Sequence, residues 1–191
     1  MTLKHLWLAA SLVLTTLSVT AQTSATPAAL PPVTTIAALN VQRYMGTWYE
    51  IAKFPNRFQA KCTANTRAQY LVQTDGSIQV LNSCIATDGS TIDALGLAKQ
   101  VGPATSPKLQ VRFAPAWLSF LPMVWGDYWV IDLDADYQLA AVSDAKREYL
   151  WVLSRTQKVD AKVYGALLER LNAQSFDVHK LELTTQTSAT R

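Results

Sequence analysis

The sequence predicts an all-β domain, an eight-stranded antiparallel up-and-down β-barrel followed by one C-terminal α-helix. The chain has 191 residues, of which 49% are apolar and 16% charged, enough to build one hydrophobic core. Eight short runs alternate apolar and polar residues, are rich in Val, Ile, Tyr, Trp and Thr, and are separated by turn signals. Short connections between consecutive strands favour a barrel, with a β-sandwich as the main alternative.

The N-terminus has the pattern of an export signal. Lys4 precedes an apolar run over residues 6–14, and small residues lead to Ala21, so residues 1–21 are predicted to be a signal peptide cleaved after Ala21. A retained anchor is the alternative, although a membrane span needs about 20 apolar residues. Residues 22–39, rich in Ala, Thr and Pro, are predicted to be a flexible leader, residues 40–183 the barrel domain and 184–191 a polar tail.

The strands follow one another closely along the domain. They are expected at residues 46–54, 66–74, 77–85, 91–101, 108–114, 127–133, 138–142 and 149–155. Asp75-Gly76 predicts a tight hairpin between the second and third strands. Apolar residues at helical spacing predict the helix over residues 160–172, behind an Asp that suits its N-terminus. A last short strand over residues 178–183 is expected at an edge.

Cys62 and Cys84 are the only two cysteines in the chain. In an exported protein such a pair favours a disulfide bond. The bond would close a loop of about 20 residues and contribute roughly 3 kcal/mol on the chain-entropy model. A free thiol and a metal ligand are the alternatives.

Charge and motif content argue against several function classes. The net charge is only +3 and the 17 Lys and Arg are scattered, which disfavours nucleic-acid binding. Beyond the predicted signal, His179 is the one histidine, and no Gly-x-Ser-x-Gly elbow accompanies it. Asp132, Asp134 and Asp136 begin like a calcium loop, but Tyr137 stands where that loop requires Gly. We therefore expect no metal, no cofactor and no catalysis.

Three segments resemble the lipocalins. They are Gly-Thr-Trp-Tyr-Glu-Ile-Ala at 46–52, Asp-Leu-Asp-Ala-Asp-Tyr at 132–137 and Tyr-Leu-Trp-Val-Leu-Ser-Arg-Thr at 149–156. Their order and their residues are most similar to those of the bacterial, Blc-like group related to apolipoprotein D. Many bacterial members are lipoproteins with a cysteine at the cleavage site, whereas this chain has Ala21-Gln22, which argues against a lipid anchor.

The resemblance implies a structural signature at one end of the barrel. Its residues are Gly46, Trp48, Asp136, Tyr137 and Arg155. Trp48 on the first strand would lie against Arg155 on the last, and a stacked cation and ring contributes about 0.5 to 2 kcal/mol. The alternative is that Trp48 is ordinary core and Arg155 ordinary surface.

Strand parity and the resemblance together predict what lines the barrel. Alternate residues share a face, so Glu50, Ala52 and Phe54 point inward if Trp48 does. The predicted ligand-binding residues are Phe54, Ala68, Tyr70, Val80, Leu109, Val111, Phe113, Tyr128, Tyr149 and Trp151. A two-residue turn at Asp75-Gly76 would put Val80 on the wrong face, so its inward position requires a bulge or a longer loop. For any one of these side chains core packing is the alternative, and Glu50 is expected to be a hydrogen-bonded structural acid.

Residues 114–125 contain no charge and carry Trp117, Phe120, Leu121 and Trp125. This segment either contacts a membrane or the bound ligand, or folds onto the barrel's own end.

The mostly apolar lining predicts a non-catalytic carrier of a fatty acid or lysophospholipid. We expect it to be periplasmic or secreted, with a peripheral position at the outer membrane as one option, and to be a monomer or homodimer. The alternatives are an isomerase or thiol-dependent enzyme on the same barrel, and a tetrapyrrole or retinoid carrier.

Overall fold

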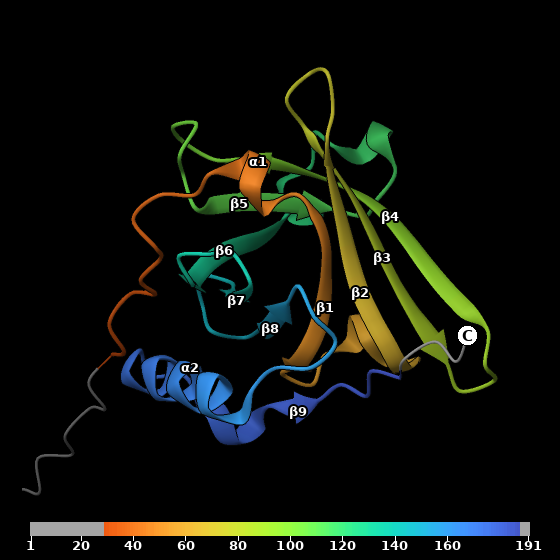
Figure 1. Cartoon of the computed structure of the whole chain (residues 1–191). Coiled ribbons are helices and arrows are strands. Elements are labelled where there is room, and N and C mark those ends of the chain that lie inside the picture. The colour runs from red at the N-terminus through yellow and green to blue at the C-terminus, as the bar shows by residue number, and fades with distance from the viewer. Residues whose placement is uncertain (1–28, 188–191) are drawn as a thin grey trace, which may run out of the picture.

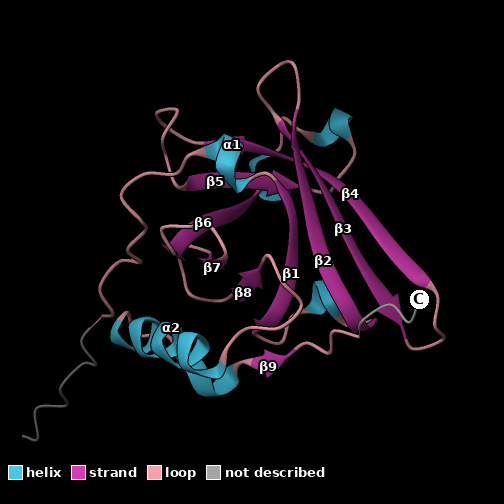
Figure 2. Ribbon diagram, in the orientation of Figure 1, coloured by secondary structure: helices cyan, strands magenta, loops and turns pink. Residues whose placement is uncertain are grey.

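The computed structural model describes residues 29–187 (Figures 1 and 2). The predicted signal peptide, residues 1–21, lies outside them. The helices and strands are α1 (Val41–Tyr44), β1 (Gly46–Lys53), η1 (Arg57–Gln59), β2 (Cys62–Val72), β3 (Ile78–Ala86), β4 (Thr91–Gln100), β5 (Lys108–Arg112), η2 (Ala116–Leu118), η3 (Pro122–Val124), β6 (Gly126–Leu133), β7 (Leu139–Ser143), β8 (Leu150–Ser154), α2 (Ala161–Ala173), η4 (Val178–Lys180) and β9 (Glu182–Leu183).

The strands form a closed antiparallel barrel, as predicted. β2 to β8 pair in chain order, and β1 joins β8 on one side and β2 on the other, which closes the wall. The sandwich alternative is therefore wrong. β2 begins four residues earlier than expected. The expected last strand over 178–183 begins as the 3-10 helix η4, and only β9 at its end pairs with β1.

Two apolar clusters lie on opposite faces of this wall. One fills the barrel around Trp48, Tyr70 and Val130. The other lies between the outer face of β6–β8 and helix α2, which buries Leu167 and Leu171 completely. Parity explains the division, because alternate residues of a strand face opposite sides.

A bulge in β1 overturns one predicted lining residue. Glu50 pairs with Leu153, which faces inward, but Ala52 pairs with Val152, which faces α2. The extra residue between them reverses the alternation. Ala52 and Phe54 therefore pack under the helix, and the prediction that Phe54 lines the interior is wrong.

The β2–β3 connection keeps Val80 facing inward. Gln73 N–H donates to the Ser77 carbonyl at 2.7 Å, which leaves a three-residue loop instead of the predicted two-residue turn. Gly76 takes the positive φ of +81° that the last position of such a loop requires. Tyr70 consequently pairs with Val80, and both face the interior.

The described part of the predicted flexible leader is docked on the barrel. Val33 and Leu39 are buried, and the amides of Ile36 and Leu39 donate to the carbonyls of Val130 and Thr105. This part of 22–39 belongs to the folded domain. Among residues 29–187, no helix has both the length and the apolar character that crossing a bilayer requires.

Candidate functional site

The end of the barrel beside α1, here called the closed end, is held by Arg155. Its guanidinium lies 3.9 Å from the centre of the Trp48 ring. Nη1 donates to the carbonyl of Thr47 at 2.8 Å, Nη2 to that of Arg43 at 2.9 Å and Nε to that of Tyr137 at 3.3 Å. One side chain thus ties α1, β1 and the β6–β7 connection together, as the resemblance implied. The alternative in which Arg155 is ordinary surface is wrong.

Gly46 and Tyr137 serve the same closed end. Gly46 has a φ of +92°, and a Cβ there would lie 3.4 Å from Nη1 of Arg155. The Tyr137 carbonyl accepts from Arg155, its hydroxyl accepts from the Asn40 amide, and its ring stacks under Arg43 at 4.1 Å. Asp136 contributes through its backbone, whose carbonyl accepts from Gln138.

Three tyrosine hydroxyls meet inside the barrel above the closed end. The Tyr128 hydroxyl lies 2.8 Å from that of Tyr44 and 3.0 Å from that of Tyr70. Burial raises the pKa of Tyr70 to about 12 and raises those of Tyr44 and Tyr128 further. All three are therefore neutral donors and acceptors beside the apolar side chains of the interior cluster. Tyr44 was missed by the parity argument because it lies on α1.

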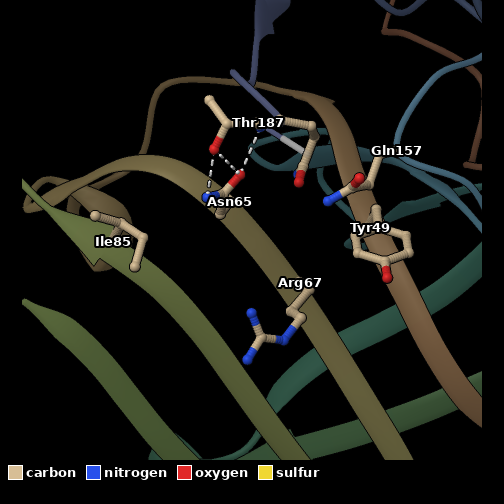
Figure 3. Close-up of a pocket in the computed structure, with 7 residues that line it drawn as sticks. Tyr49, Asn65, Arg67, Ile85, Gln157 and Thr187 are labelled. Atoms are coloured by element: carbon tan, nitrogen blue, oxygen red, sulfur yellow. Dashed lines mark hydrogen bonds between the residues drawn. The ribbon is translucent and has the colours of Figure 1, made fainter. Parts of the chain in front are cut away.

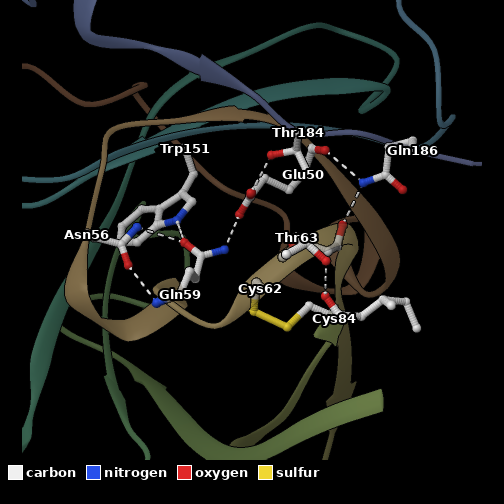
Figure 4. The surroundings of a disulfide bond; sticks show 11 residues. Glu50, Asn56, Gln59, Cys62, Thr63, Cys84, Trp151, Thr184 and Gln186 are labelled. Atoms are coloured by element: carbon white, nitrogen blue, oxygen red, sulfur yellow. Dashed lines mark hydrogen bonds between the residues drawn. A yellow bond between two sulfur atoms is a disulfide. The ribbon is translucent and has the colours of Figure 1, made fainter. Parts of the chain in front are cut away.

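A polar chain crosses the opposite end, here called the mouth (Figure 4). Trp151 Nε1 donates to Gln59 Oε1 at 2.9 Å, and Gln59 Nε2 donates to Glu50 Oε2 at 2.5 Å. Thr184 donates to the other carboxylate oxygen at 2.5 Å. Burial raises the pKa of Glu50, while the bonds from Thr184 and Gln59 oppose the shift. Glu50 is thus a buried, hydrogen-bonded acid.

Gln59 is positioned by the loop between β1 and β2. Asn56 caps η1 by accepting from the Gln59 amide at 3.1 Å, and its side-chain amide donates to Gln59 Oε1 at 2.7 Å. No pattern in the sequence singled out Gln59, because its partners Glu50 and Trp151 lie 9 and 92 residues away along the chain.

The Cys62–Cys84 disulfide joins the ends of β2 and β3 at the mouth (Figure 4). It confirms the predicted pairing, and neither cysteine is a free thiol. This leaves no nucleophile for the thiol-dependent enzyme alternative. Among the described residues, no group of three His, Cys, Asp or Glu side chains gathers as a metal site.

The predicted polar tail is part of the wall as far as Thr187. β1 and β2 separate beyond the Tyr49–Arg67 pair, and the segment after β9 lies between them. Thr184 N–H donates to the Ile51 carbonyl, Asn65 N–H to the Thr185 carbonyl, and the Gln186 amide to the carbonyls of Glu50 and Thr66. We call residues 182–187 the C-terminal strap.

The remaining predicted lining residues fall into three groups. Ala68, Tyr70, Val80 and Leu109 are buried in the interior cluster, and Val111, Tyr128 and Trp151 pack against it. Tyr149 stacks on Trp151 at 5.7 Å at the mouth, beside Phe58. Phe113 lies where β5 has ended, is 44% exposed, and covers Gly96, where a Cβ would come within 2.7 Å of its ring.

Two hollows of the described surface are both on the outer wall. The first, of about 170 Å³, is lined by Tyr49, Asn65, Arg67 and the C-terminal strap (Figure 3). The second, of about 510 Å³, lies over β3–β5 and is lined by Leu95, Leu97, Arg112 and Phe113. Neither of these two hollows opens into the barrel interior, where the side chains of the cluster around Trp48, Tyr70 and Val130 pack.

One part of the apolar segment 114–125 folds onto the barrel, and another part is exposed, as a contact with a membrane or a ligand would require. Trp125 folds back on the wall, with Lys99 at 4.3 Å from its ring and Arg112 at 5.3 Å. Trp117, Phe120 and Met123 point away and are 73%, 74% and 85% exposed, while Leu121 is half-buried.

Comparison with known proteins agrees with this geometry. A family model described as a lipocalin-like domain matches residues 39–186. Temperature-induced lipocalin-1 of Arabidopsis thaliana is 43% identical over 153 residues, covering 79% of this chain and 81% of that protein. Outer membrane lipoprotein Blc of Escherichia coli is 37% identical, covering 78% and 82%. The structure of insecticyanin from the tobacco hornworm Manduca sexta superposes with a TM-score of 0.66 at 18% identity, covering 86% and 89%. The chain belongs to the lipocalin family, whose fold binds hydrophobic ligands.

Proposed function

We propose that the protein carries a fatty acid or lysophospholipid in its barrel, within the cell envelope, without catalysis. The observation that carries this proposal is the contrast between the two ends. The closed end is fixed by the many contacts of Arg155, whereas the mouth is crossed by the single Gln59 side chain. An acyl chain would enter beside Trp151 and Tyr149 after Gln59 moves aside, and each buried methylene contributes about 0.8 kcal/mol.

The interior suits both the polar group and the acyl chain of such a ligand. Most of the side chains that line it are apolar, and the three tyrosine hydroxyls and, at the mouth, Glu50 add polar groups. A neutral hydroxyl cluster can hydrogen-bond a carboxyl or ester group, and the apolar walls accept the chain. The Blc relative is named an outer membrane lipoprotein, which supports a place in the cell envelope.

Titration of delipidated protein with palmitate and with lysophosphatidylcholine tests the proposal. Saturable quenching of tryptophan fluorescence is expected, and Trp151→Phe should lose most of it. Trp129→Phe is the matched control, because Trp129 lies on the outer face against Lys108. Trp151→Asp should abolish uptake. Wild-type protein that binds neither lipid by fluorescence or calorimetry contradicts the proposal.

A tetrapyrrole or retinoid carrier is the second candidate, favoured by the hydroxyl cluster of Tyr44, Tyr70 and Tyr128. Such ligands bring several polar groups that the three hydroxyls could bind. Visible absorbance that co-purifies with the protein, and is lost in Tyr128→Phe, would replace the lipid proposal with this one.

We also propose that the exposed side chains of segment 114–125 contact a lipid surface. Trp117, Phe120 and Met123 form an uncharged group beside half-buried Leu121 and Trp125. Co-sedimentation with phosphatidylcholine vesicles tests this, and the double variant Trp117→Ser, Phe120→Ser should bind several-fold less. Equal sedimentation of variant and wild type would contradict the contact.

A further inference from the structure

The hollow over β3–β5 contains a buried cation without a counter-ion. Arg112 is 7% exposed although it lies on the outer face of the barrel wall. Its Nη1 donates to the carbonyl of Ala114, but its Nε has no acceptor among residues 29–187. Buried charged groups are normally paired, so this guanidinium is an exception that requires an explanation.

No acidic side chain of the chain supplies the missing charge. All 14 Asp and Glu residues lie within the described residues, and none forms an ion pair with Arg112. By register Asp127 is the closest acid on the same face, because it pairs with Gln110, yet it does not come within ion-pair distance. A second cation, Lys99, lies 4.3 Å from the centre of the Trp125 ring, and Arg112 lies 5.3 Å from the same ring. The local charge is therefore positive and uncompensated.

The walls of the hollow define what kind of anion fits. Leu95, Leu97, Phe113 and Pro115 contribute apolar side chains to them, and Gln73 and Gln79 contribute amide groups. The volume of about 510 Å³ exceeds what an isolated inorganic anion needs. Exposed Trp117 and Phe120 follow directly in the chain. The chemistry that matches is an anionic head group joined to alkyl chains.

We infer that the hollow beside Arg112 binds the anionic head group of a membrane phospholipid while segment 114–125 enters the lipid surface. The guanidinium would donate to phosphate oxygens, a charge-assisted pairing that Arg geometry favours. This inference rests on the proposed membrane contact of segment 114–125 and does not depend on the ligand inside the barrel.

Vesicle binding separates the two surfaces. Wild-type protein should bind vesicles of phosphatidylglycerol and phosphatidylcholine more tightly than vesicles of phosphatidylcholine alone. Arg112→Leu should lose this preference, weakening binding to the anionic vesicles about tenfold, the equivalent of one charge-assisted hydrogen bond, while binding to phosphatidylcholine is unchanged. Arg67→Leu, on the outer wall at β2, removes the same net charge and should keep the preference.

Each outcome decides the matter. An anionic preference that survives in Arg112→Leu, or that Arg67→Leu loses equally, overturns the inference and leaves general charge attraction. Weaker binding of Trp117→Ser, Phe120→Ser to both vesicle types, with the preference for anionic vesicles kept, supports a head-group site at Arg112 that is separate from the apolar contact. Full displacement from the vesicles by millimolar inorganic phosphate would show a site for free phosphate and also overturn the inference.

A second measurement covers the case in which Arg112→Leu does not fold. Wild-type protein is titrated with soluble dihexanoyl-phosphatidylglycerol and followed by ¹H–¹⁵N NMR. Shifts of the Arg112 side-chain Nε–H and of the Trp125 indole, absent with dihexanoyl-phosphatidylcholine, are expected. Shifts that fall elsewhere, or that are identical for the two lipids, contradict the site.

Discussion

Replacing Arg155 by Met tests how the closed end is held. Met keeps an unbranched apolar stem but removes the charge, the hydrogen bonds to the carbonyls of Thr47, Arg43 and Tyr137, and the contact with the Trp48 ring. We expect the free energy of unfolding to fall while the barrel topology is retained.

The contacts of Arg155 set the size of the effect. A hydrogen bond that involves a charged group contributes about 1.5–3 kcal/mol, and a cation over an indole about 0.5–2 kcal/mol. Arg155 is only half-buried and its bond to Tyr137 is long at 3.3 Å, so the lower values apply and the terms are not additive. The expected loss is about 3–4 kcal/mol, a large part of the roughly 5–15 kcal/mol that stabilises a domain.

Urea unfolding followed by tryptophan fluorescence measures the change, and two variants control it. Arg155→Lys keeps a charge near Trp48, but a single ammonium cannot reach the separate carbonyls, so an intermediate loss of about 2 kcal/mol is expected. Arg170→Met breaks a surface pair with Asp132, in which the arginine is 51% exposed, and should cost about 0.2–1 kcal/mol. If Arg155→Met costs no more than Arg170→Met, the assigned role of Arg155 is refuted.

Three further changes probe the mouth and the wall. Cys62→Ser with Cys84→Ser should lower the free energy of unfolding by about 3 kcal/mol in urea titrations, because the bond closes a 22-residue separation; no loss would contradict this. Burial raises the pKa of Glu50 above its usual 4.5, so the folded state favours the protonated carboxyl. The free energy of unfolding should therefore fall as the pH rises from about 4.5 through the folded-state pKa. Glu50→Gln should remove that slope between about pH 4 and 8. Gly96→Ala places a Cβ 2.7 Å from the Phe113 ring and 2.9 Å from the Arg112 carbonyl, and should cost about 1–3 kcal/mol in thermal unfolding.

Strand positions could be predicted because their signal is local. Alternation along β1 places Trp48 inward, and the same alternation on β8 separates Trp151 from Val152. The disulfide followed from composition and compartment, which also require no knowledge of the fold. The inward positions of Tyr70 and Val80 came from the resemblance, and Val80 faces the interior because the loop after Gln73 has three residues instead of two.

The features that the sequence did not predict all depend on contacts between residues distant in the sequence. The bulge before Ala52 aligns β1 with β8 and with α2, so no neighbour of Phe54 indicates which side it takes. The strap resembles an ordinary polar tail, yet Thr184 bonds Glu50 at a separation of 134 residues. Arg112 follows the strand alternation and gives no sign that its guanidinium is buried and unpaired.

The Glu50 carboxylate is hydrogen-bonded both to Gln59 at the mouth and to Thr184 of the C-terminal strap, so a ligand that moves Gln59 also affects the strap. Glu50 accepts from Gln59 on the side of the barrel interior and from Thr184 on the side of the strap, and its backbone carbonyl accepts from Gln186. A ligand that displaces Gln59 deprives a buried carboxylate of one of two donors, and buried polar groups strongly favour being bonded. Either the ligand supplies a donor or the strap adjusts. A ligand with a hydroxyl or protonated acid group near the mouth meets this demand, and a pure hydrocarbon does not.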